Sequence, residues 1–196
     1  MPGSSLWLAP PSDHPYHEIL SELITKSLPS EFPSVVGPPF SPHMTLTSNI
    51  DPSVYGDNPQ QWLDSIPWPT GDEVKILFRG IRTGDVFFRR GYIKVYDTEP
   101  VKSLAGLARA RGVEGEDSIG PKTEKWLKEW TASFGPHVSL IYGGDPIDDT
   151  KLAQIGEFCG ESGLELQGGG WKGGVVWLVP TDKPINQWKP IATKTL

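Results

Sequence analysis

Hydrophobic positions recur along the chain with two different periods. Apolar residues spaced three or four apart predict amphipathic helices that begin near Pro15, Pro59, Lys102, Lys125 and Asp149. Short stretches rich in β-branched and aromatic residues predict strands at Ser5–Ala9, Met44–Thr47, Val74–Gly80, Val86–Tyr96, Val138–Tyr142 and Val175–Val179. Because helices and short strands are interleaved, we expect an α+β protein with helices packed against sheets.

Turn and cap signals mark the boundaries of these elements. Ser12–Asp13 before Pro15 predicts the cap of the first helix, and Gly112 is expected to end the helix over 102–111. The segments 29–42, 112–121 and 168–174 are rich in proline and glycine and are expected to be surface connections.

Composition narrows the class of protein. The chain has 196 residues, 37% of them apolar, which is typical of one folded domain. The longest apolar run, Val175–Val179, is too short to span a bilayer, and Met1–Ser5 does not resemble a secretory signal. A single cysteine, Cys159, excludes an internal disulfide.

Charge is unevenly distributed. The whole chain carries a net charge of −6, which argues against a general binder of polyanions. The segment 74–96 has the opposite sign, with a net charge of +5. This segment indicates either a local anionic ligand or the solvated face of two strands.

One pattern occurs twice. The sequence Ser41-Pro-His-Met-Thr-Leu46 is repeated as Gly135-Pro-His-Val-Ser-Leu140, so His43 and His137 lie 94 residues apart. In a strand, alternate side chains share a face, so each unit presents an imidazole and a hydroxyl together. The apolar residues between them point to the other face.

Two such units suit phosphoester chemistry. One imidazole can remove a proton from an attacking oxygen while the other protonates the leaving oxygen. Two hydroxyls can donate hydrogen bonds to phosphate oxygens. A single unit of this kind is more typical of a structural histidine, and a zinc site would need three or four ligands. The chain lacks the G-x-S-x-G motif, so the sequence does not indicate a serine hydrolase of that type.

The paired Pro-His-x-[Ser/Thr]-Leu units resemble the signature motifs of the 2H phosphoesterase superfamily. The opening strand Ser5–Pro10, the segment Arg82–Phe88 and Tyr142 extend the resemblance to its eukaryotic, fungal-type cyclic phosphodiesterases. The resemblance implies a bilobal fold over residues 1–196, with two antiparallel sheets related by a pseudo-two-fold axis and helices on the outer faces. The terminal lobe would take about 1–70 plus 160–196, and the central lobe about 71–159.

The resemblance also implies an activity. Similar enzymes convert ADP-ribose 1'',2''-cyclic phosphate, a by-product of tRNA splicing, to ADP-ribose 1''-phosphate, and nucleoside 2',3'-cyclic phosphates to 2'-phosphates. By motif, His43 and His137 are the catalytic pair, and Thr45 and Ser139 bind the phosphate. Positions in the substrate cleft match Trp7, Phe88 and Tyr142, with Phe87 as an alternative if the strand parity differs by one.

Further expectations concern the oligomeric state, cofactors, partners and compartment. We expect a monomer that acts on a small cyclic phosphate without metal or other cofactor, without a membrane and without a stable nucleic-acid partner. The cytoplasm is the expected compartment, with Golgi association, as assigned to fungal relatives, as the alternative. Two other functions stay open: an RNA-end phosphodiesterase or 2'-5' RNA ligase of the same superfamily, and a non-catalytic nucleotide-binding module.

Overall fold

One antiparallel sheet forms the centre of the protein. The computed structural model describes residues 3–196 and shows an α+β fold. Its eight strands occur in the order β6-β3-β4-β5-β2-β1-β7-β8. The strands are β1 (Ser4–Ala9), β2 (Met44–Ile50), β3 (Lys75–Thr83), β4 (Gly91–Val95), β5 (His137–Ile141), β6 (Gln167–Lys172), β7 (Val175–Pro180) and β8 (Ala192–Thr195).

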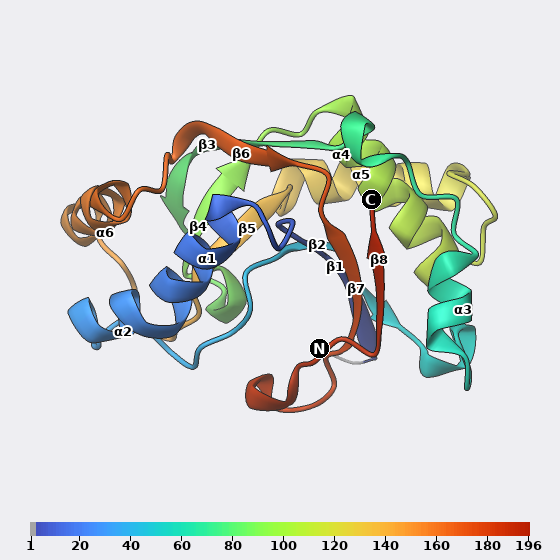
Figure 1. The fold of residues 1–196 in the computed structure, drawn as a ribbon, viewed down its shortest axis with the longest axis horizontal. Helices are drawn as coiled ribbons and strands as arrows, with labels where there is room; N and C mark the ends of the chain where they lie inside the picture. The colour runs from blue at the N-terminus through green and yellow to red at the C-terminus, as the bar shows by residue number, and fades with distance from the viewer. Residues whose placement is uncertain (1–2) are drawn as a thin grey trace.

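The helices form two groups around this curled sheet. They are α1 (Pro15–Glu22), α2 (Leu28–Glu31), α3 (Pro59–Asp64), α4 (Glu99–Arg109), α5 (Pro121–Ser133) and α6 (Asp149–Glu161). In Figure 1, α1, α2 and α6 gather on the left, whereas α3, α4 and α5 lie on the right. A π-helical segment, 23–27, joins α1 to α2, and another, 110–114, extends α4. Within residues 3–196, no helix has the length and apolar character needed to cross a membrane.

The two strands that carry the repeated motif are neighbours in the middle of the sheet. Met44 of β2 pairs with Val138 of β5 in antiparallel orientation. This pairing divides the strand order into two sets of four, β6-β3-β4-β5 and β2-β1-β7-β8. The structure therefore contains one continuous sheet, where the family resemblance implies two, because the motif strands themselves bond to each other.

The core lies where helices cover this sheet. Met44, Leu46, Val138 and Leu140, the apolar positions of the two motifs, are all fully buried. Helix α4 contacts β2, and the π-helical segment 23–27 contacts β5. Each motif strand is thus held from the side opposite its histidine, as the alternating pattern predicts.

Two helix boundaries differ from the expected ones. The cap of α1 is His14, whose Nδ1 accepts a hydrogen bond from the backbone N–H of Tyr16, so the prediction of Ser12–Asp13 was wrong. Gly112 does not end the helix over 102–111, because the chain continues to a left-handed Gly115. A Cβ at Gly112 would lie 3.0 Å from Ile50, so this glycine permits close packing against β2 instead.

The strands differ from the sequence prediction at three places. The stretch 86–96 is not one strand: residues 87–89 form a 3-10 turn, and β4 begins at Gly91. The glycine-rich stretch 168–174, expected as a surface connection, contains most of the edge strand β6. The other edge strand, β8, is short and polar and was missed. Edge strands lack a strong apolar pattern, so they are found only through their pairing.

Strand β6 pairs with β3, although its residues belong to the segment that the resemblance assigns to the terminal lobe. Gly170 of β6 has a φ of +145° and pairs with Leu77. A Cβ at this position would lie 1.9 Å from the carbonyl oxygen of Ile76. Only glycine can therefore occupy this point of contact between β6 and β3.

We expect Gly170→Ala to lower the free energy of unfolding by about 2 kcal/mol or more, because the added methyl group displaces β6. The matched control is Gly160→Ala, in the exposed last turn of α6, where a Cβ meets no atom within 4 Å. That change should be neutral or stabilise by up to about 1 kcal/mol. Urea unfolding of both variants checks this, and equal effects would contradict the role of Gly170.

Candidate active site

The register between β2 and β5 brings the four motif side chains together. Since Met44 pairs with Val138 in antiparallel orientation, His43 lies opposite Ser139, and Thr45 lies opposite His137. Directly opposed residues on one face have Cβ atoms about 4.5–5.5 Å apart. The two imidazoles and two hydroxyls therefore form a compact group on one face of the sheet.

Both imidazoles are held in the same way. Nδ1 of His43 donates a hydrogen bond to the carbonyl oxygen of Ser41 at 2.6 Å, and Nδ1 of His137 donates to that of Gly135 at 2.9 Å. A carbonyl can only accept, so the proton of each neutral ring resides on Nδ1. Nε2 of each ring is left with its lone pair and can act as a base. The Pro-His sequence shapes this local turn, since the acceptor is two residues before the histidine in both motifs.

Burial keeps both rings neutral. His43 is 4% exposed and His137 is 8% exposed. Burial lowers the pKa of each to about 4, and the backbone hydrogen bonds oppose this only in part. A positive charge on His137 would further lower the pKa of His43, which shows that the rings interact. At pH 7 the unliganded protein therefore holds two neutral imidazoles side by side.

The two histidines have different neighbours. The indole of Trp7 stacks on His43, with ring centroids 3.6 Å apart and planes inclined by 10°. His137 contacts the edges of Tyr92 and Phe134 instead. The guanidinium of Arg89 lies over these same two rings, and its charge lowers the pKa of His137.

The hydroxyls are in different states. Ser139 Oγ donates a hydrogen bond to the carbonyl oxygen of Phe88 at 2.8 Å. Thr45 is half-buried, and its Oγ1 has no hydrogen-bond partner among residues 3–196. Both hydroxyls line the same cavity and can be redirected toward a ligand there.

A cavity of about 270 Å³ lies over this face of the sheet. Of the candidate residues, Thr45, His137, Ser139, Phe88 and Tyr142 line it. His43 and Trp7 do not, because the Trp7 ring and the surrounding aromatic side chains cover His43.

The three predicted cleft aromatics belong to one cluster. Trp188 contacts the rings of Trp7, Phe88 and Tyr142 at centroid distances of 5.6, 5.9 and 6.4 Å. Phe40 stacks on Tyr142 at 3.6 Å. Trp7 and Tyr142 are almost fully buried, so most of their surface is used within the protein.

The chain matches a known protein family over its whole length. The model of a family described as "Cyclic phosphodiesterase-like protein" matches residues 1–196. The chain belongs to this family. The match confirms the resemblance to cyclic phosphodiesterases of the 2H superfamily that the two motifs indicate, and with it the expectation of a phosphodiester-hydrolysing enzyme.

Curated fungal relatives align over the whole chain. A protein of Neurospora crassa named 2',3'-cyclic-nucleotide 3'-phosphodiesterase is 53% identical over 212 aligned residues, which cover 100% of both chains. Proteins of the same name from Phaeosphaeria nodorum and Yarrowia lipolytica are 46% and 28% identical. The first of these two alignments covers 100% of both chains, and the second covers 98% of this chain and 99% of the relative.

The site includes residues that the motifs do not reveal. The charge of Arg89 acts on His137, and Trp188 contacts the ring of Trp7. Arg109, Trp126 and Trp130 line the cavity. The helical spacing of Trp126 and Trp130 and the basic character of segment 74–96 were visible in the sequence. Neither signal showed that these side chains lie at the cavity that His137 lines.

The basic segment 74–96 does not form one anion site. Arg90 is 6% exposed, and its guanidinium donates to the carbonyl oxygens of Gly84, Gly143 and Gly144. Arg90 therefore holds the loop at Gly84 against the loop at Gly143–Gly144. Lys75, Arg79 and Arg82 are exposed side chains of β3, as the solvated-strand interpretation expects. Arg89 is the member whose charge acts on a motif histidine.

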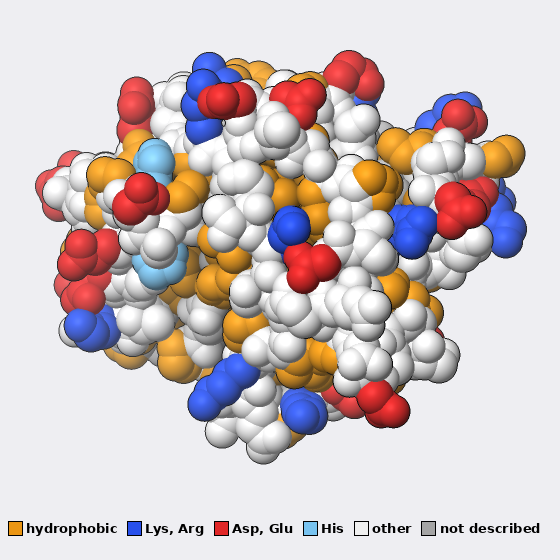
Figure 2. All heavy atoms as spheres, turned by 45° about the vertical axis from the view of Figure 1, so that its right-hand side comes forward, with side chains coloured by type: hydrophobic (Ala, Val, Ile, Leu, Met, Phe, Trp, Pro, Cys, Tyr) orange, Lys and Arg blue, Asp and Glu red, His pale blue; other side chains and the backbone are white. Residues whose placement is uncertain are grey.

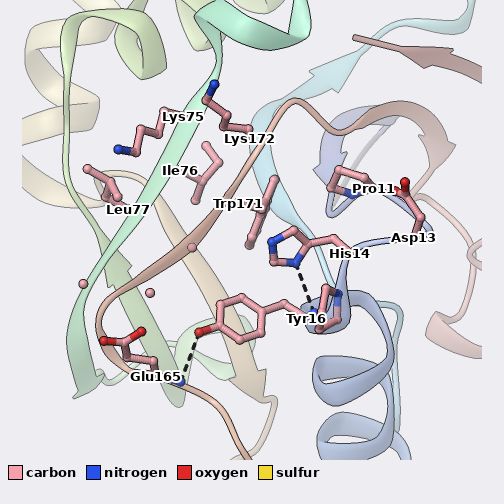
Figure 3. A pocket seen from close by; sticks show the side chains of 14 residues that line it. Pro11, Asp13, His14, Tyr16, Lys75, Ile76, Leu77, Glu165, Trp171 and Lys172 are labelled. Atoms are coloured by element: carbon pink, nitrogen blue, oxygen red, sulfur yellow. Dashed lines mark hydrogen bonds between the residues drawn. The ribbon is translucent and has the colours of Figure 1, made fainter.

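A larger hollow, of about 890 Å³, lies between the start of α1 and strands β3 and β6 (Figure 3). In this view the His14 ring lies next to Trp171 and the Tyr16 ring extends toward Glu165. Lys75 and Leu77 lie farther up. The hydroxyl of Tyr16 accepts a hydrogen bond from the backbone N–H of Glu165. Neither motif histidine lines this hollow, so the smaller cavity is the candidate active site.

We expect the free energy of unfolding to fall as the pH decreases from 6.5 toward 4. In that range the unfolded chain binds protons at His43 and His137, whereas the folded protein, with pKa values of about 4, does not. The loss reaches up to about 1.4 kcal/mol per pH unit for each histidine. Urea unfolding at several pH values should show a shallower dependence for the double variant His43→Asn/His137→Asn. An unchanged slope would contradict the burial argument.

Proposed function

We propose that this protein hydrolyses nucleoside 2',3'-cyclic phosphates to nucleoside 2'-phosphates, with His43 and His137 as its acid–base pair. The observation that carries the proposal is the pairing of Met44 with Val138, which puts both motifs on one face of the sheet beside a cavity. The names of the fungal relatives support the same reaction.

The proposed chemistry needs one water molecule and two proton transfers. Nε2 of the base removes a proton from water as its oxygen attacks the phosphorus atom in line with the 3' oxygen. The bond between phosphorus and the 3' oxygen breaks, and Nε2–H of the acid protonates that oxygen. The phosphate remains on the 2' oxygen. The next cycle requires the proton to move from the base to the acid, through solvent.

The surroundings of the two histidines support His137 as base and His43 as acid. The fixed positive charge of Arg89 opposes protonation of His137, which keeps its Nε2 lone pair available. The face of Trp7 against His43 attracts a cation through its quadrupole, which favours the imidazolium form there. The proton that the reaction requires therefore resides on His43.

The hydroxyls of Thr45 and Ser139 complete the proposed phosphate site. Each hydroxyl lies opposite a histidine on the neighbouring strand, so both can donate to the non-bridging oxygens between the two rings. The phosphate also brings the negative charge that the site lacks. Its binding raises the pKa of the nearby imidazoles and allows one of them to be protonated near neutral pH.

We propose ADP-ribose 1'',2''-cyclic phosphate as a second substrate, hydrolysed to ADP-ribose 1''-phosphate, which would place the enzyme downstream of tRNA splicing. The reaction breaks a phosphate ester at a ribose hydroxyl in the same way, so the same pair of histidines serves both. Phe88 and Tyr142 in the cavity, with Trp7 beside His43, are the proposed contacts for the ribose next to the phosphate.

We also propose that the two four-stranded sets of the sheet represent the two lobes, related by a pseudo-two-fold axis between β2 and β5. Each set has a motif strand at the centre of the sheet and an edge strand at its far end, which supports the relation. A monomeric, metal-independent enzyme in the cytoplasm, with Golgi association as the alternative, completes the proposal.

A long RNA substrate receives less support. Among the described residues that line the cavity, Arg109 is the single cation. Figure 2 shows Lys and Arg side chains spread among Asp and Glu on one face of the molecule, without a continuous basic track. Binding a nucleic-acid backbone needs several such cations in a row. This distribution favours a small cyclic phosphate over an RNA end.

Replacement of either histidine by alanine should lower kcat by roughly 100-fold to 10,000-fold. Phosphorus NMR of incubations with 2',3'-cyclic AMP and with ADP-ribose cyclic phosphate measures this and identifies the ester bond that breaks. EDTA should leave the wild-type rate unchanged. Circular dichroism of each variant controls for folding. Near-normal turnover by both single variants would refute the assignment, and loss of activity in EDTA would refute metal independence.

The pH dependence of kcat/KM should be bell-shaped, because one imidazole must be neutral and the other protonated. Burial lowers both pKa values in the free enzyme, so the optimum should lie below pH 6.5. The optimum of kcat should lie at higher pH, because bound phosphate raises these pKa values. Steady-state rates over a pH series test this, and a monotonic curve or coincident optima would contradict it.

A further inference from the structure

One wall of the cavity has no part in the proposed chemistry. It is formed by Trp126 and Trp130 of α5 and by Arg109 at the end of α4, and we call it the α5 wall. Residues four apart on a helix share a face, and the two indole rings stack with centroids 5.3 Å apart and planes inclined by 16°. They line the same cavity as His137 and Ser139.

The α5 wall contributes two half-buried indole rings to a cavity that is also lined by Phe88 and by Phe134, which is 40% exposed. Tyr142 is 3% exposed and has Phe40 stacked on one face, and Trp7 is 2% exposed with His43 stacked on it. Trp126 and Trp130 are only half-buried. Phe134 has the guanidinium of Arg89 over its ring, and Phe88 contacts the rings of Tyr142 and Trp188. The indole pair of α5 therefore remains as a surface on which a flat ligand group can stack.

Arg109 adds a hydrogen-bond donor to the α5 wall. Its Nε and Nη2 both bind the same carboxylate oxygen of Glu114, at 2.7 and 2.6 Å, and its guanidinium lies 5.1 Å from the ring centre of Trp126. Nη1 has no hydrogen-bond partner among residues 3–196. Because Glu114 neutralises the guanidinium, this donor suits an uncharged acceptor better than a second phosphate.

We propose that the α5 wall is the nucleobase subsite of the enzyme: the base stacks on Trp126 and Trp130, and Nη1 of Arg109 donates to an acceptor atom on its edge. The inference rests on the proposed function, since it assigns a place to the base of a cyclic nucleotide whose phosphate lies at the histidines. Stacking on an aromatic side chain strengthens binding by roughly fivefold or more per base.

The test compares a substrate with a base, 2',3'-cyclic AMP, and one without, glycerol 1,2-cyclic phosphate. The wild type should prefer the nucleotide in kcat/KM. Trp130→Ala should lower kcat/KM for cyclic AMP roughly 10-fold, chiefly through KM, and change that for the glycerol ester less than about twofold. Arg109→Lys, which keeps the charge that pairs with Glu114 but removes the free Nη1, should reduce the same preference by about fivefold.

The matched control is Trp62→Ala, which removes a half-buried tryptophan of α3 that packs on Tyr55 outside the cavity. It should leave kcat/KM for both substrates unchanged. Equal losses for both substrates in Trp130→Ala, or no loss for either, would overturn the subsite. If both Trp130→Ala and Arg109→Lys retain the wild-type preference, the subsite is likewise excluded.

Calorimetric titration with adenosine separates this inference from the proposed function. Adenosine carries no phosphate, so its binding depends on the base subsite and not on hydrolysis. We expect weak binding to the wild type and at least fivefold weaker binding to Trp130→Ala. A wild type that binds adenosine but hydrolyses neither ester would refute the proposed function alone. A wild type that hydrolyses both equally well and binds no adenosine would refute the subsite alone.

Discussion

The pairing of β2 with β5 is the interaction on which the site depends. It rests on a single assigned residue pair, Met44 with Val138, at the centre of an eight-stranded sheet. Each motif supplies one imidazole and one hydroxyl, which alone do not make an acid–base pair. Antiparallel pairing sets His43 against Ser139 and Thr45 against His137, so that equivalent residues from distant parts of the chain lie together on one face of the sheet. Buried apolar residues on the opposite face fix this register.

Burial at this position has an electrostatic consequence. The site holds two neutral histidines, each oriented by a backbone carbonyl, and no carboxylate among residues 3–196 bonds to either ring. A carbonyl fixes the tautomer without bringing a full negative charge. On the proposed mechanism, the substrate's phosphate supplies that charge and thereby draws in the proton that the reaction consumes. Phosphate binding and activation of the site are then the same event.

On the proposed mechanism, two equivalent motifs perform different tasks because their neighbours differ. Trp7 lies on one ring and the charge of Arg89 acts on the other, and these two residues come from separate parts of the sheet and its loops. The same principle extends to the proposed base subsite. Residues of α4 and α5 that have no place in either motif contribute the wall of the cavity. The motifs would thus define the reaction, and the surrounding elements its proton assignment and specificity.

The sequence by itself determined the α+β class, most helices, the inner strands and the family, because these follow from local periodicity and from two short motifs. It also indicated that histidine and hydroxyl share a face within each strand. The tertiary structure alone decided what depends on contacts between distant residues. These include the single sheet, the edge strands β6 and β8, the cap at His14 and the closeness of Arg89 to His137. It also showed that Trp7 and Tyr142 are covered while Trp126 and Trp130 line the cavity. Strand order, burial and pKa are set by neighbours across space, and no local pattern of residues encodes them.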